Sequence, residues 1–316
     1  MKILANDGIS QSGIDDLTAA GFEVLTTTVA QEQLVNFINS ENIVALLVRS
    51  ATTVRQDLID ACPGLKIIGR GGVGMDNIDV GYAREKGLSV INTPAASSES
   101  VAELVFAHLF SGVRFLYDSN RSMPLEGEKK FKNLKKAYAK GTELRGKTLG
   151  VIGFGRIGQA TAKMALGLGM KVIAFDPFME KTTVSLSFFD GQTVDFEIKT
   201  VSKETVLKES DFITLHVPAQ KDFVIGEAEL DMMKEGAALI NAARGGVVNE
   251  VALVAALDTN KLSFAGLDTF ENEPTPAVQI LMNSKISLTP HIGAATNQAQ
   301  DRIGSELASQ IISILK

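Results

Sequence analysis

A glycine-rich turn near the middle of the chain most constrains what this sequence can fold into. The apolar run Thr148–Ile152 stops at a Gly-x-Gly-x-x-Gly pattern formed by Gly153, Gly155 and Gly158. An amphipathic stretch follows and leads to a second apolar run that ends at Asp176. This order predicts a strand, a tight turn, a helix and a parallel strand, which is the βαβ unit of an open α/β sheet.

The residue types in the turn indicate a dinucleotide site. Gly153 permits the tight turn, Gly155 lets the backbone approach a pyrophosphate, and Gly158 lets the helix pack on the strand. The first helical residues, Arg156 and Ile157, offer N–H groups to the anion. A glycine-rich turn that binds nothing is the alternative reading of this segment.

The acid at the end of the second run favours NAD. Asp176 follows Gly158 by 18 residues, near the offset expected for the carboxylate that holds the ribose hydroxyls. A carboxylate at this position repels a 2′-phosphate, so the pattern predicts NAD rather than NADP.

Composition excludes several other classes of protein. The 316 residues are 45% hydrophobic, enough for two domains with separate cores. A net charge of −6 argues against general binding to nucleic acid or anionic membrane. One cysteine and three histidines argue against a disulfide or a metal site. Because no apolar run approaches about 18 residues, we expect no membrane span, no signal peptide and a cytoplasmic location.

Alternating apolar and amphipathic stretches predict two doubly wound units. Strands of the first are expected at Met1–Asn6, Glu23–Leu25, Ile43–Val48, Ile67–Arg70 and Ser89–Asn92. Strands of the second, a full Rossmann sheet, are expected at Thr148–Ile152, Lys171–Phe175, Asp211–Leu215, Ala238–Asn241, Phe264–Leu267 and Ile286–Leu288. Ser185–Val201 is expected to be a loop or an extra strand.

Helices are expected at Ser10–Ala20, Gln31–Asn39, Val101–Tyr117 and Asn297–Leu315, with the run Ser97–Ser100 capping the third. Segment Arg121–Lys140 is expected to be a surface helix and loop. Returning the last helix to the first unit gives an α/β fold in which a Rossmann cofactor domain is inserted into a flavodoxin-like substrate domain. The predicted domains are residues 1–97 plus 290–316 for substrate and 98–289 for NAD, with both ligands in the cleft between them.

Three polar residues follow predicted strands of the second unit, at the edge where open α/β sheets bind ligands. Arg244 offers a rigid fork of donors that suits a carboxylate. His291 titrates in the range that acid–base chemistry needs, and a neighbouring carboxylate would orient its ring and favour the imidazolium. Glu273 is one candidate for that carboxylate and Glu271 is its rival. The alternatives are a surface ion pair for Arg244 and a capping or buried role for His291.

The remaining histidines and cations have more ordinary readings. His108 lies in an apolar helix and is expected to be a core or interface residue, whereas His216 ends a strand and is either structural or near the cofactor. In the first domain, Arg49 and Ser50 end one strand, and Arg70 begins a glycine loop whose exposed amides are expected to form an anion nest. A plain turn is the alternative for this loop. We expect a solvent-exposed helix face to carry Lys129, Lys130, Lys132, Lys135 and Lys136. The alternative is that these lysines contact a phosphate.

Over nearly its whole length the chain resembles the D-isomer-specific 2-hydroxyacid dehydrogenases. The carrying segments are Val48–Thr52, Gly69–Asp79, Asn92–Pro94, Gly141–Gly150, the Gly153 turn, Asn241–Gly246, Gly266–Asp268 and Pro290–Ala294. An ordered set of this kind is specific for the family. The resemblance implies a catalytic trio in which His291 is the acid/base, Glu273 its partner, and Arg244 the group that binds the substrate carboxylate and polarises the reacting C–O bond.

The resemblance also implies the remaining contacts. Asp268 would meet the nicotinamide amide. Further cofactor contacts are expected from Val73, Val217, Pro218, Ala242 and Gly293. The substrate would meet Arg49, Ser50, Arg70, Val73 and Gly74. A homodimer built through the cofactor domain, including the Val101–Tyr117 helix, is also implied.

Within the family the likeness is greatest to members that oxidise 3-phospho-D-glycerate to 3-phosphohydroxypyruvate, at the start of serine synthesis. Many of those carry C-terminal domains that sense serine and a tryptophan near Phe131. This chain ends at Lys316 and has no tryptophan, so we expect no serine feedback through such a domain. A reductase of hydroxypyruvate, glyoxylate or another 2-keto acid needs the same trio, and an NADH-sensing corepressor is a third reading.

Overall fold

The computed structural model describes all 316 residues, and they divide into two compact units. Unit 1 comprises Met1–Ser100 and Ala294–Lys316, and unit 2 comprises Val101–Gly293. The change from one unit to the other therefore falls at residues 100 and 293, where the sequence had suggested 97 and 289. Each unit holds its own parallel sheet, so the fold class is α/β with two doubly wound domains.

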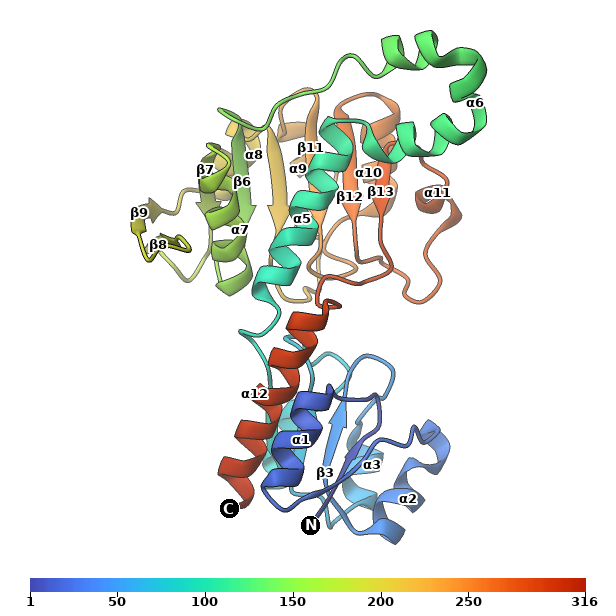
Figure 1. The fold of residues 1–316 in the computed structure, drawn as a ribbon, viewed down its shortest axis with the longest axis vertical. Coiled ribbons are helices and arrows are strands. Elements are labelled where there is room, and N and C mark those ends of the chain that lie inside the picture. Colours follow the sequence, from blue (N-terminus) through green and yellow to red (C-terminus); the bar gives the residue numbers. More distant parts are fainter. The chain divides into compact units, whose positions relative to one another are not determined.

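Unit 1 is built on five parallel strands in the order β2-β1-β3-β4-β5, the flavodoxin-like order. The strands are β1 (Lys2–Ala5), β2 (Glu23–Leu25), β3 (Ile43–Val48), β4 (Ile67–Arg70) and β5 (Ser89–Asn92). Its helices are α1 (Gln11–Ala19), η1 (Gln31–Gln33), α2 (Leu34–Glu41), α3 (Gln56–Ala61), α4 (Val80–Glu85) and α12 (Asn297–Leu315). The final helix α12 lies beside α1 (Figure 1) and buries Ile303, Leu307 and Ile311.

Unit 2 is built on six parallel strands in the order β13-β12-β11-β10-β6-β7. They are β6 (Thr148–Ile152), β7 (Lys171–Phe175), β10 (Phe212–Leu215), β11 (Ala237–Asn241), β12 (Leu262–Leu267) and β13 (Ile286–Leu288). Alternate residues of each strand face opposite sides of the sheet. One side therefore packs on α5 (Ser98–Val113) and α7 (Arg156–Gly167), and the other packs on α8 (Lys203–Glu209), α9 (Glu227–Met232) and α10 (Glu250–Asp258).

The segment Ser185–Val201, expected to be a loop or one extra strand, belongs to an antiparallel hairpin. Its strands are β8 (Lys181–Ser187) and β9 (Thr193–Lys199). The β-forming residues alternate along both strands, and Val184 and Ile198 are buried against the core of unit 2. Gly191, with φ +85°, lies in the turn between them, so the apparent irregularity of the sequence marks a hairpin turn.

Two helix predictions were wrong at their ends. The helix expected to reach Tyr117 stops at Val113, because Phe115 adopts a left-handed φ of 54°. A new helix, α6, then runs from Leu116 to Ala137, through much of the segment expected to be part helix and part loop. Figure 1 shows α6 standing away from the sheet, and none of its residues is buried. In addition, the helix expected at Gln31–Asn39 is a short 3-10 turn followed by α2.

The only other helix, α11, spans Val278–Leu281. The helices of the structure include none with both the length and the apolar character that crossing a bilayer requires.

Candidate active site

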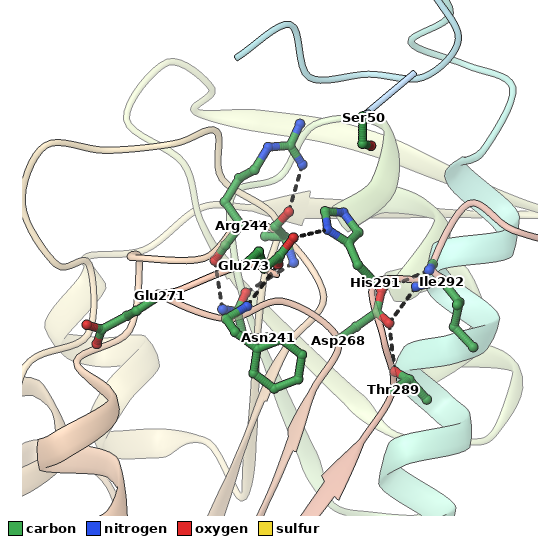
Figure 2. Close-up of polar contacts among 12 residues, drawn as sticks. Ser50, Asn241, Arg244, Asp268, Glu271, Glu273, Thr289, His291 and Ile292 are labelled. Carbon is green, nitrogen blue, oxygen red and sulfur yellow. Dashed lines mark hydrogen bonds and ion pairs between the residues drawn. The ribbon is translucent and has the colours of Figure 1, made fainter. Parts of the chain in front are cut away.

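Side chains with acid–base chemistry gather at one edge of the unit 2 sheet. Arg244 follows β11, Glu273 follows β12 and His291 follows β13. These three strands are parallel neighbours, so the loops after them leave from the same edge. Figure 2 shows the three side chains together at this place.

His291 and Glu273 form a hydrogen-bonded pair. His291 Nδ1 lies 2.8 Å from Glu273 Oε2, and Glu273 Oε1 accepts a bond of 3.0 Å from the N–H of Phe270. Because a carboxylate only accepts, Nδ1 carries the proton and donates it to Glu273. The side chains are 41% and 36% exposed, so the other ring nitrogen, Nε2, is left within reach of a ligand.

The rival carboxylate, Glu271, has a different partner. It accepts a 2.7 Å bond from the backbone N–H of Glu250, and its own N–H donates to Glu250 Oε1 at 2.8 Å. Figure 2 shows its side chain pointing away from His291. Glu271 therefore joins its loop to the start of α10, and Glu273 is the carboxylate at the imidazole. Burial, together with the nearby Glu271 charge, raises the pKa of Glu250.

Asp268 holds the turn that carries His291. Its carboxylate is 1% exposed. Oδ1 accepts from the Thr289 hydroxyl at 2.7 Å and the Ile292 N–H at 2.8 Å, and Oδ2 accepts from the Gly293 N–H at 2.8 Å. His291 has a left-handed φ of 55°, a conformation that non-glycine residues rarely adopt without such support. Asp268 thus fixes the backbone on both sides of the imidazole.

Asn241 shapes the loop that carries Arg244. Its side-chain oxygen accepts from the Ala243 N–H at 3.1 Å, and its side-chain N–H donates to the Arg244 carbonyl at 2.9 Å. The half-buried guanidinium donates to the Ala243 carbonyl at 2.7 Å. The loop conformation is therefore set from the last residue of β11, directly beneath the guanidinium.

The glycine turn after β6 is open on one side and closely packed on the other. Gly153 has φ +89°, and a Cβ there would lie 2.5 Å from the His216 carbonyl oxygen. A Cβ at Gly158 would lie 2.2 Å from the Gly153 oxygen, whereas one at Gly155 would meet no atom within 4 Å. The turn is thus tight where strand and helix meet and open where α7 begins at Arg156, which is the cradle a pyrophosphate requires.

Asp176 connects this turn to the end of β7. One carboxylate oxygen accepts from the Phe154 N–H at 2.8 Å and the other from the Phe178 N–H at 2.9 Å. A carboxylate oxygen has two acceptor positions, so each keeps one for a ribose hydroxyl. The residues at this edge therefore fit NAD. Val217 and Pro218, after β10, and Ala242, after β11, leave the sheet at the same edge.

The other two histidines are held by hydroxyl groups. The His216 Nε2 lies 3.2 Å from Thr161 Oγ1 and 3.1 Å from Thr214 Oγ1, and burial lowers its pKa to about 3. His108 is 2% exposed and lies between the hydroxyls of Ser287 and Thr289. The structure thus places His216 as an uncharged ring beside the turn and His108 as a satisfied core residue.

At the carboxyl edge of the unit 1 sheet, Arg49 and Ser50 follow β3, and Arg70 ends β4. Arg70 Nη2 donates to Ser50 Oγ at 3.4 Å. Val73 and Gly74 lie in the loop after Arg70, where Val73 O accepts a 2.7 Å bond from the side chain of Asn92.

Asp7 is a residue at this edge that the sequence did not single out. It accepts from the N–H groups of Arg49 and Thr52 at 2.6 and 3.1 Å and so shapes the loop after β3. Its position after β1, the neighbour of β3, was the available signal. The lysines of the run 129–136 are exposed on α6, as expected of a solvated helix face.

Comparison with known proteins assigns the family. Residues 106–293 match the family model described as D-isomer specific 2-hydroxyacid dehydrogenase, NAD binding domain. The chain is 43% identical to a hydroxypyruvate reductase of Thermotoga maritima over 93% of its length and 91% of that protein. It is 38% identical to a D-3-phosphoglycerate dehydrogenase of Archaeoglobus fulgidus over 100% of its length, and spans 58% of that longer protein.

The fold agrees with solved structures of the same kind. A D-lactate dehydrogenase of Aquifex aeolicus, crystallised with NAD and lactic acid, superposes with a TM-score of 0.75 at 29% identity, covering 100% of this chain and 95% of that one. The chain therefore belongs to the D-isomer-specific 2-hydroxyacid dehydrogenase family and is an NAD-dependent dehydrogenase.

Proposed function

We propose that this enzyme oxidises 3-phospho-D-glycerate to 3-phosphohydroxypyruvate, the first step of serine biosynthesis. The substrate hydroxyl gives its proton to His291 Nε2, and the carbon that bears it gives up a hydride. NAD, when bound, supplies the hydride acceptor. The products are the keto acid, NADH and an imidazolium at His291, so atoms and charge balance.

The observation that supports this chemistry best is the His291–Glu273 hydrogen bond in the domain that carries the glycine turn. With its proton at Nδ1, the ring presents an unshared pair at Nε2, as a general base requires. Glu273 keeps the ring in this tautomer and stabilises the imidazolium after proton transfer. In the reverse direction the same imidazolium protonates the keto oxygen.

We assign the remaining roles by position and charge. Arg244 binds the substrate carboxylate with a planar fork of donors and polarises the reacting C–O bond. Unit 1 is the substrate-binding domain, and its substrate contacts are Arg49, Ser50, Arg70, Val73 and Gly74. Unit 2 is the NAD-binding domain. Its turn residues and Asp176 hold the cofactor together with Val73, Val217, Pro218, Ala242, Asp268 and Gly293. Asp268, whose Oδ2 accepts a single bond from Gly293, has an acceptor position for the nicotinamide amide.

The choice of substrate depends on charge. Arg49 and Arg70 place two guanidinium side chains at one sheet edge of unit 1, which suits an acid with a second anionic group. Reduction of hydroxypyruvate is the second candidate, favoured by the 43% identity to a hydroxypyruvate reductase. Both reactions use the same trio, so only the substrate distinguishes them.

A substrate panel tests the proposal. Initial rates are measured with NAD and 3-phosphoglycerate, D-glycerate and D-lactate, and with NADH and hydroxypyruvate and glyoxylate. We expect kcat/KM for 3-phosphoglycerate to exceed that for D-glycerate at least tenfold, by an order-of-magnitude expectation for one buried charge-assisted contact. Equal values would leave the family activity and remove the phosphoglycerate assignment.

We also propose a homodimer assembled through unit 2, in the cytoplasm. Helix α6 buries no residue within its own chain, and its apolar side chains are exposed, Leu125 by 84% and Phe131 by 57%. Exposed apolar side chains clustered on one helix are typical of an interface. Sedimentation equilibrium should give twice the 33.7 kDa chain mass, and the mass of a single chain would contradict the dimer.

A further inference from the structure

A chain of buried hydrogen bonds runs from helix α5 to the turn that carries His291. The His108 ring meets Ser287 Oγ through Nδ1 at 2.9 Å and Thr289 Oγ1 through Nε2 at 3.0 Å. Thr289 Oγ1 lies 2.7 Å from Asp268 Oδ1, and the same carboxylate accepts from the N–H groups of Ile292 and Gly293. His291 lies within the stretch of backbone that these bonds hold.

The Asp268 carboxylate sets the donor and acceptor of each hydrogen bond in this series. Asp268 only accepts, so the Thr289 hydroxyl must donate to it. Thr289 Oγ1 then accepts from His108 Nε2–H, and His108 Nδ1 accepts from the Ser287 hydroxyl. Burial lowers the pKa of His108, an effect that the Asp268 charge offsets in part. The ring is therefore neutral, with its proton on Nε2.

Helix α5 packs closely on strand β12 at His108. A Cβ at Gly266 of β12 would lie 2.7 Å from His108 Cβ, so the ring packs directly on the strand backbone. From there it reaches Ser287 at β13 and Thr289 just beyond it. An apolar side chain of equal size would fill the space but would leave the Thr289 hydroxyl free to turn away from Asp268.

We propose that His108 and Thr289 are positioning residues for the acid/base. Because His108 donates to the Thr289 hydroxyl, that hydroxyl donates its own proton to Asp268. The resulting bonds to Asp268 hold the 289–293 turn in the conformation that places His291 at the sheet edge. The inference deepens the proposed function, because it depends on His291 being the proton acceptor. The buried Asp268 carboxylate needs all of its donors, since a buried charge that loses one is strongly destabilised.

The first test observes the hydrogen bonds of His108 and Thr289 directly by NMR and needs neither cofactor nor a turnover measurement. With only three histidines, the chain labelled with 15N-histidine gives three ring spin systems in long-range 1H–15N spectra. We expect His108 to be neutral with its proton on Nε2 at pH 7. Thr289→Val should shift the His291 ring signals, and Thr289→Ser should restore them. A proton on Nδ1 of His108, or His291 signals unmoved by Thr289→Val, would overturn the proposal.

The second test measures turnover in matched pairs. Thr289→Val and His108→Leu remove the donors, and Thr289→Ser and His108→Gln retain them. We expect the first pair to lower kcat roughly tenfold, as loss of one hydrogen bond to a buried charge does. The second pair should recover most of the loss.

Ser210→Ala is the control for a buried hydroxyl in the same domain. Its Oγ donates to the Val206 carbonyl and has no link to the 289–293 turn. It should lower Tm and leave kcat unchanged. Equal kcat in Thr289→Val and the wild type, or equal losses in Thr289→Val and Thr289→Ser, would refute the positioning role. Full activity in His291→Gln would instead refute the proposed function, so the two failures are distinguishable.

Discussion

The edge of the unit 2 sheet and the interior of unit 2 place histidine in opposite environments. At the sheet edge, the His291 side chain is 41% exposed and is paired with a carboxylate. In the interior, the ring nitrogens of His108 and His216 hydrogen-bond only to hydroxyl groups, and burial lowers the pKa of both. A carboxylate neighbour and solvent access permit a ring to gain and lose a proton, whereas a dry pocket of hydroxyls keeps it neutral.

The comparison is tested most severely by removing the exposed ring. His291→Gln should lower kcat/KM by roughly three orders of magnitude, the contribution typical of a general acid or base. Binding of NADH, measured by fluorescence titration, should be unchanged because the glycine turn is intact. A loss of less than tenfold would make His291 as dispensable for chemistry as a buried histidine.

Removing the carboxylate partner is the next largest effect. Glu273→Gln should lower kcat by about 10- to 100-fold, because the His291 ring loses the carboxylate that orients it through Nδ1 and balances the charge of the imidazolium formed in the reaction. Glu271→Gln is the matched control, since Glu271 contacts Glu250 instead. Equal kcat values for the wild type and Glu273→Gln would remove the proposed partnership.

The buried histidine His216 is predicted to make the stability of the protein depend on pH. His216 has a folded pKa of about 3, below its unfolded value, so the unfolded chain binds a proton that the native state excludes. The free energy of unfolding should therefore fall as pH drops below about 6.5, by about 2 kcal/mol between pH 7 and pH 5 from this residue. In His216→Gln, the free energy of unfolding measured by urea denaturation should lack this part of the fall between pH 7 and pH 5. A variant that follows the wild-type curve would show that His216 is protonated in the native state.

The smallest effect concerns the carboxylates beside the site. Burial raises the pKa of Glu250. At pH values above the pKa of this residue in the unfolded chain, the Glu250 charge therefore lowers the free energy of unfolding. In acid, where Glu250 is protonated in both states, this destabilisation disappears. Glu250→Gln keeps an acceptor for the Glu271 N–H and removes the charge. We expect Tm to rise by roughly 2 °C at pH 8 and by nothing at pH 4. A lower Tm at pH 8 would show that the charge itself is required.

The sequence predicted the sheets better than it predicted the connections. Seven strands, among them Ile43–Val48 and Lys171–Phe175, begin and end where the apolar runs do, because a buried parallel strand is apolar throughout. The β8–β9 hairpin was missed because its alternation is short and mixed with charges. The break at Phe115 was missed because a single left-handed residue has no signal in an apolar segment.

At the site, strand order limits what a sequence can reveal. Position after a strand was enough to select Arg244, Glu273 and His291. It could not separate Glu273 from Glu271, since two residues in one loop differ only in the direction of their side chains. Nor could it connect His108 with Asp268, which meet through Thr289 only because α5 packs across β12 and β13.

A crystal structure with NADH and oxalate would test the central claim most directly, since oxalate offers one carboxylate and one acceptor oxygen in the place of a keto group. The account predicts His291 Nε2 within about 3 Å of that acceptor oxygen, with the Arg244 guanidinium on the carboxylate and the Glu273 bond to Nδ1 retained. Oxalate bound beside the nicotinamide with no contact to His291 would contradict it.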